Sequence, residues 1–116
     1  MADLMRSFEE LGKSFDELTK KFRAYLETSK YDSKKDVDKW FADLSKATKE
    51  VEAALADTQR KLEATKTAYD EFLKTKKRDI KQDKTLQVTL SIMRNAIETQ
   101  GELTDKIQNH LNRHKA

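Results

Sequence analysis

Hydrophobic residues recur near the N-terminus at alternating steps of four and three. The positions with this spacing are Leu4, Phe8, Leu11, Phe15, Leu18, Phe22 and Tyr25. These steps place the side chains on one face of an α-helix, as in the a and d positions of a coiled-coil heptad. Asp3 can cap the start by accepting amide hydrogen bonds, and the polar run SKYDSKKD follows Glu27. The pattern therefore predicts a helix over about residues 3–29.

A second heptad stripe begins after Ser33 and Asp36, which resemble a capping box. Its apolar positions are Val37, Phe41, Leu44, Val51, Leu55, Leu62, Tyr69 and Phe72. The register positions between them hold Thr48, Thr58 and Thr65. Since no Gly or Pro interrupts the segment, we expect one long helix over about residues 34–77. The threonines have two interpretations: small positions that face the phenylalanines of the first helix, or a polar seam that selects a partner.

The third stripe lies in the C-terminal part of the chain. It holds Leu86, Leu90, Met93, Ile97, Ile107 and Leu111. Residues 86–92 also alternate between apolar and polar with a period of two, but a strand there would have no partner strand. We therefore expect a helix over about residues 84–113. Gly12 and Gly101 fall inside the first and third helices, where each costs about 1 kcal/mol relative to alanine, and a close helix crossing would offset that cost.

The unequal lengths of the three predicted helices constrain how they pack. The central helix is half again as long as the others, so an antiparallel bundle cannot cover it evenly. Either this helix bends or breaks near AALAD, residues 53–57, which gives four shorter helices, or the bundle ends that are only two helices thick bury their exposed apolar side chains against a second copy. We expect an all-α fold, an elongated antiparallel three-helix bundle or coiled coil with a long central helix, in a single domain over residues 1–116. The second arrangement makes it an elongated homodimer.

Composition supports long, charged helices and excludes several classes of protein. Hydrophobic residues make up 36% and charged residues 39% of the chain, with no Pro and only two Gly, so the usual residues of tight turns are nearly missing. The absence of Cys excludes disulfides and zinc–thiolate sites and suits a reducing compartment. The longest uncharged run, Thr85–Met93, is far shorter than the roughly 20 residues of a membrane span. We expect a soluble, cytoplasmic protein.

No residue pattern in the chain indicates catalysis. Its only imidazoles are His110 and His114, near the C-terminus. They lie four residues apart, a spacing that can hold zinc, but no carboxylate lies in the same turn, so we interpret them as cationic side chains near a helix C-terminus. No phosphate-binding glycine motif occurs. We therefore predict no catalytic, cofactor-binding or metal-binding residues, and a protein that is not an enzyme.

Two features are candidates for contacts with other molecules. The first is the aromatic doublet Trp40–Phe41, together with Tyr31. Adjacent residues cannot both face one helix seam, so we expect one ring to lie on the flank, either packed at the edge of the core or exposed as a docking anchor.

The second feature is the stretch KTKKRDIKQDK, residues 74–84, which has six positive and two negative charges. Its candidate contacts with an anionic surface are Lys76, Lys77, Arg78 and Lys81. We interpret the stretch first as a solvated bend between helices and second as a membrane-facing patch. Nucleic-acid binding is not expected, because no aromatic residues interleave the cations and acids interrupt them.

These observations favour a non-enzymatic interaction or scaffolding module. Such a module would act by coiled-coil packing with itself or with a partner helix. The alternative is a helical dimer that binds a membrane surface through residues 74–84.

Overall fold

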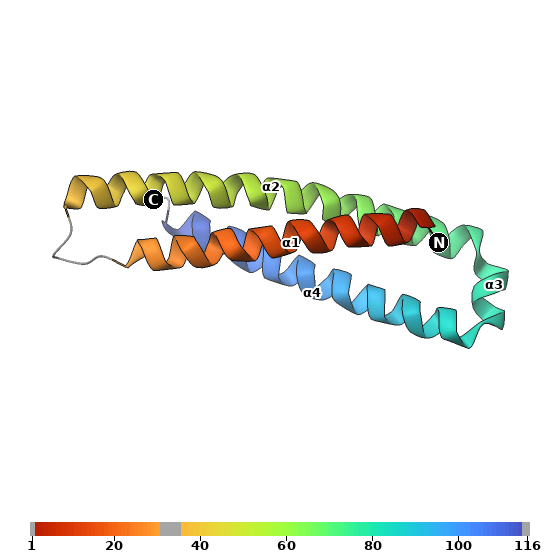
Figure 1. The fold of residues 1–116 in the computed structure, drawn as a ribbon. Coiled ribbons are helices and arrows are strands. Elements are labelled where there is room, and N and C mark those ends of the chain that lie inside the picture. The colour runs from red at the N-terminus through yellow and green to blue at the C-terminus, as the bar shows by residue number, and fades with distance from the viewer. Residues whose placement is uncertain (1, 31–35, 115–116) are drawn as a thin grey trace.

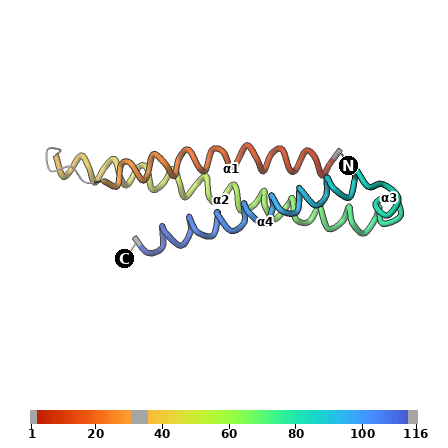
Figure 2. The backbone as a smooth tube through the Cα atoms, turned by 90° about the horizontal axis from the view of Figure 1, so that it is seen from below, coloured from red at the N-terminus to blue at the C-terminus, as the bar shows by residue number. Residues whose placement is uncertain are grey.

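The computed structural model describes residues 2–30 and 36–114, and nearly all of them are helical. Its helices are α1 (Ala2–Ser29), α2 (Val37–Thr75), α3 (Lys77–Gln82) and α4 (Lys84–His114) (Figure 1). The three long helices run alongside one another in alternating directions, and α4 crosses the α1–α2 pair obliquely (Figures 1 and 2). The molecule extends 64 × 22 × 18 Å, and its radius of gyration is 18.5 Å. A compact domain of this length would have a radius of about 13 Å, so the predicted elongated all-α bundle is confirmed.

The described helices match the predicted segments, with one correction around the basic stretch. The second helix ends at Thr75, and residues 77–82 form the short helix α3 instead of a simple bend. Helix α3 forms there because Ile80 turns inward and packs in the same cluster as Leu90 and Met93. The backbone then leaves the helical conformation at Asp83, whose carboxylate accepts a hydrogen bond from the amide of Leu86 in α4.

The central helix is continuous through residues 53–57, so the predicted alternative of a break near AALAD into shorter helices is wrong. Its N-cap is Asp36, whose carboxylate accepts a hydrogen bond from the amide of Asp38 at 2.9 Å. Ser33, which the sequence suggested as the cap, lies outside the described residues.

Small polar residues hold α1 close to α2. Thr58 and Thr65 are fully buried. The Thr58 hydroxyl lies 2.9 Å from the Ser14 hydroxyl and donates to the Ser14 carbonyl oxygen at 3.2 Å. The Thr65 hydroxyl donates to the Ser7 carbonyl oxygen at 3.1 Å. Thr58 and Thr65 therefore contact serines and backbone of α1. The interpretation that the three threonines face its phenylalanines stays a prediction.

The apolar core lies where the stripes of the three long helices meet. Its most buried side chains are Leu4, Leu11, Leu18, Tyr25, Val51, Leu55, Leu62, Leu90, Met93, Ile97, Ile107 and Leu111. Each of its three clusters combines residues of α1, α2 and α4. The predicted stripe of each long helix thus supplies core residues, with exceptions at the start of α2.

The first turns of α2 project beyond the other helices (Figure 1). Because Ser14 lies opposite Thr58 and the two helices are antiparallel, Ser29 at the end of α1 lies level with about Asp43. Helix α4 ends earlier still, since Leu111 packs in the same cluster as Val51. Val37 and Phe41 are consequently 44% and 57% exposed in the single chain, which agrees with the prediction that the ends of the long helix are left uncovered.

Candidate functional site

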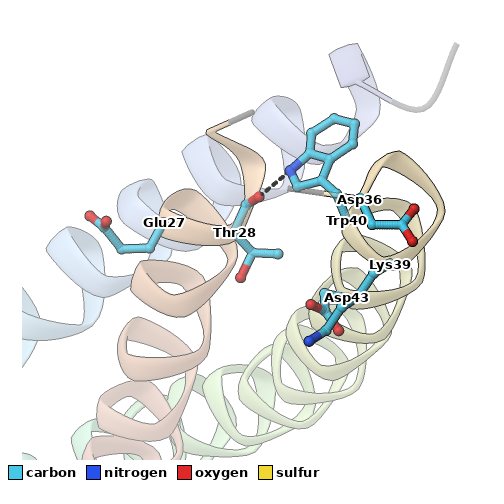
Figure 3. Close-up of a pocket in the computed structure, with 6 residues that line it drawn as sticks. All are labelled: Glu27, Thr28, Asp36, Lys39, Trp40 and Asp43. Atoms are coloured by element: carbon cyan, nitrogen blue, oxygen red, sulfur yellow. Dashed lines mark hydrogen bonds between the residues drawn. The ribbon is translucent and has the colours of Figure 1, made fainter. Parts of the chain in front are cut away.

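Trp40 joins the start of α2 to the end of α1. Its indole nitrogen Nε1 donates a hydrogen bond of 2.7 Å to the carbonyl oxygen of Thr28 (Figure 3). That carbonyl belongs to the last turn of α1, where backbone oxygens lack helical partners. Phe41 stacks its ring at a tilt beside Trp40, with centroids 4.8 Å apart, and is mostly exposed. Of the candidate partner-binding residues, Trp40 therefore has a structural contact, Phe41 is available, and Tyr31 lies outside the described residues.

Trp40 and Thr28 help to line a pocket of about 510 Å³ between the end of α1 and the start of α2. Its charged lining residues are Glu27, Asp36, Lys39 and Asp43. Figure 3 shows Glu27 on α1 and Asp36 on α2 directed away from each other. Among the described residues, no three His, Asp or Glu side chains gather closely enough to hold a metal ion. The pocket therefore presents separate carboxylates and no metal site.

His110 packs against aromatic rings of α1. Its imidazole meets Phe22 edge-on, with centroids 5.5 Å apart, and Tyr25 edge-on at 6.0 Å. Edge-to-face contacts of this kind are favourable because the ring edge is positive and the ring face negative. The side chain of His114 lies outside the described part of the chain. His110 thus serves the packing of α4 against α1.

A groove of about 580 Å³ lies between α1 and α4. Apolar side chains from both helices line it: Phe15, Phe22, Leu103 and Ile107. The cationic residues Arg23, Lys106 and Arg113 also line it, and no Asp or Glu does. The sequence alone does not indicate this groove, because Arg23 and Lys106 lie far apart in the chain. The available signal was Leu103, an apolar residue at which the register of the third stripe drifts.

The apolar lining of this groove continues along α4 toward its N-terminus. Val88 is 59% exposed, Ile92 63% and Leu103 40%. Ile92 precedes Leu103 by eleven residues, about three whole helical turns, and Val88 precedes Lys106 by about five whole turns. Residues that are separated by whole turns lie on the same side of a helix. Val88 and Ile92 therefore lie on the side of α4 that faces the groove. The alternation in residues 86–92 reflects this second apolar stripe beside the core stripe, and not a strand.

Helix α1 contributes a matching line of side chains. Met5, Gly12 and Thr19 are seven residues apart and so share one side of the helix, and Thr19 lines the groove. Met5 is 38% exposed. A Cβ atom added to Gly12 would meet no atom within 4 Å, and one added to Gly101 would meet Leu62 at an ordinary 3.6 Å. Packing within the described chain therefore requires neither glycine, contrary to the expectation of close crossings. We call the surface formed by Met5, Phe15, Phe22, Val88, Ile92 and Leu103 the α1/α4 face.

The four candidate cations of the basic stretch, Lys76, Lys77, Arg78 and Lys81, are all exposed. Lys77 and Lys81 are four residues apart on α3 and so share one side of it. Asp79 lies among these cations. The stretch is thus a solvated connection that displays several cations at one end of the molecule.

An ion cluster supports the α1–α2 contact on its outer side. The Asp57 carboxylate accepts a hydrogen bond of 2.7 Å from the Ser14 hydroxyl and lies 3.1 Å from the Lys61 ammonium. The Ser14 hydrogen bond and Lys61 together hold the pKa of Asp57 below its ordinary value of 3.8. Asp57 stays ionised at neutral pH and belongs to the helix packing, not to a catalytic pair.

No family model matches the chain, and no curated protein or solved structure matches it either. Over the described residues, none of the helices has the length and apolar character that crossing a membrane requires.

Proposed function

We propose that this protein is a non-enzymatic helical interaction module. It acts by coiled-coil-like packing of a partner helix, or of a second copy, against its exposed apolar side chains. The observation that carries the proposal is the α1/α4 face, where apolar residues of two helices stand exposed along one side of the bundle. Aligned exposed apolar side chains mark interaction sites more often than singly scattered ones.

The projecting start of α2 supports self-association. Val37 and Phe41 belong to the first turns of α2, which project beyond the other long helices (Figure 1), and both are exposed. Two copies that meet at these ends would bury both residues from each copy around a two-fold axis. This arrangement is the elongated homodimer that the uneven helix lengths predict.

We expect sedimentation velocity to show an elongated dimer at micromolar concentration. Phe41→Ser should weaken the dimer at least tenfold, because the exposed ring contributes most of the apolar area at the projecting end. Ala64→Ser serves as a control, because Ala64 is exposed on α2, away from that end and outside the α1/α4 face.

The broader proposal has its own test, which is binding of fluorescent amphipathic helical peptides of either charge. A chain that stays monomeric at all accessible concentrations and binds none of these peptides would contradict the interaction module itself. A monomer that binds a peptide would contradict only the homodimer.

A second candidate function is attachment to an anionic membrane surface through residues 74–84. The observation that favours it is the grouping of exposed cations on and beside α3, at one end of the molecule. Each cation near such a surface contributes about 1 kcal/mol of attraction. We interpret residues 74–84 mainly as the connection between α2 and α4, because Asp79 and Asp83 interrupt the cations and Ile80 faces the core.

Replacing Lys76, Lys77, Arg78 and Lys81 with glutamine should leave binding to anionic liposomes unchanged. Exposed charges also contribute little to folding, so the variant should melt like the parent. Liposome flotation at low and high salt measures the outcome. A salt-sensitive loss of binding, on the order of 4 kcal/mol for four cations, would instead establish the membrane function.

A further inference from the structure

We infer that the α1/α4 face is a docking site for an acidic amphipathic helix of a partner protein. This inference rests on the proposed role as an interaction module, and it names both the surface and the chemistry of the partner. The occupant is a helix with an apolar stripe flanked by Glu or Asp.

The shape of the face suits a helix. Met5 and Arg23 on α1 are eighteen residues apart, which corresponds to about 27 Å along the helix axis. A partner helix of about 18 residues would span that length. It would lie in the groove between two helices and add a fourth helix to the bundle, as amphipathic helices do when they enter apolar grooves.

The apolar lining provides anchors along the whole length. Val88 and Ile92 stand at one end and Leu103 in the middle, and all three are exposed in the isolated chain. Phe15 and Phe22 are partly buried and line the groove from the side of α1. A helix with apolar residues at steps of three and four would cover these side chains.

Gly12 allows a partner to approach closely. An added Cβ at this position would meet no atom within 4 Å apart from the neighbouring backbone of α1, although glycine is unfavourable inside a helix. The glycine lies on the same side of α1 as Met5 and Thr19, which places it on the docking face. A helix that crosses here can bring its own side chains against the backbone of α1.

The positive charge of the groove favours a partner helix with negatively charged side chains. Arg23, Lys106 and Arg113 line it, and no carboxylate does. Among the described residues, none of these three cations is paired with an Asp or Glu. Glutamates that flank the apolar stripe of a partner helix would therefore find cations ready for pairing, whereas lysines there would be repelled.

The test uses two synthetic peptides of about 18 residues with identical leucine stripes. Glutamate flanks the stripe in one peptide and lysine in the other. Fluorescence anisotropy measures the binding of each to the full chain. We expect the acidic peptide to bind at least tenfold more tightly, and salt to weaken its binding.

Two variants locate the site. Arg23→Gln/Lys106→Gln/Arg113→Gln should weaken the acidic peptide at least tenfold. Its matched control, Lys76→Gln/Lys77→Gln/Arg78→Gln, removes the same charge at the opposite end and should leave binding unchanged. Gly12→Leu should also weaken binding at least tenfold, while circular dichroism shows a helix content and melting temperature no lower than those of the parent.

Several results would overturn the inference while the interaction module stands. One is equal affinity of the protein for the two peptides. Another is an equal loss of affinity for the acidic peptide in the two triple variants. A third is loss of self-association in the groove variants, which would make a second copy the occupant. Binding of the parent to phosphatidylserine vesicles through the groove cations, without peptide binding, would assign the face to a membrane instead. If neither peptide binds and the chain stays monomeric, the inference and the proposed function fail together.

Discussion

Replacing Leu18 with alanine should lower the free energy of unfolding by about 3–5 kcal/mol. Leu18 is 0% exposed and lies in the largest core cluster, among Tyr25, Val51 and Leu55. Truncation removes buried methyl groups and leaves a cavity that three rigid helices cannot fill by relaxing. A domain of this size has a total stability of about 5–15 kcal/mol, so the variant loses a large share of it.

Urea unfolding followed by circular dichroism measures the loss for Leu18→Ala. Val88→Ala is the matched control, because it also shortens an apolar helical side chain but at a position that is 59% exposed. Its stability should change by about 0.5 kcal/mol or less. Equal effects of the two substitutions would show that Leu18 does not lie in a packed core.

Thr58→Phe should destabilise the protein by about 2–3 kcal/mol, because it overfills the contact between α1 and α2. Thr58 is fully buried, and its hydroxyl lies within 3.2 Å of both the hydroxyl and the carbonyl oxygen of Ser14. A phenyl ring at this position forces the two helices apart and removes both contacts. The change tests whether small side chains set the distance between the helices.

The control for this substitution is Thr67→Phe on the same helix. Thr67 is exposed, and threonine and phenylalanine have similar helix propensities, so this variant should unfold like the parent. Thermal unfolding of both variants provides the comparison. A Thr58→Phe variant as stable as Thr67→Phe would mean that the helices separate without cost, and that the Ser14–Thr58 contact does not fix their distance.

Local sequence determined the helices and most of their core faces. Steps of three and four place Leu4, Leu11, Leu18 and Tyr25 on one side of α1 regardless of what packs there, so the buried stripe follows from helix geometry alone. Helix geometry also predicts that Trp40 and Phe41 differ in exposure, because neighbours on a helix point in different directions. The spacing of Leu90, Met93 and Ile97 likewise predicts the core stripe of α4, and all three are buried.

The axial offset between helices was decided only by tertiary structure. Heptad spacing repeats every seven residues, so it allows several offsets of α1 along α2 with equal matching of apolar stripes. The contacts of Thr58 with Ser14 and of Thr65 with Ser7 select one of them. That choice leaves the start of α2 beyond the end of α1, and so exposes Phe41.

The α1/α4 face depends on the same tertiary information. Arg23 and Lys106 share a groove because α1 and α4 run in the same direction with Leu11 and Ile97 in one cluster. Nothing in either segment alone specifies this pairing, since each helix carries charges on several sides. The sequence therefore determined which residues share a side of each helix. The packing of the three helices decided which of those sides meet and which remain exposed, because that packing depends on contacts between residues distant in the chain.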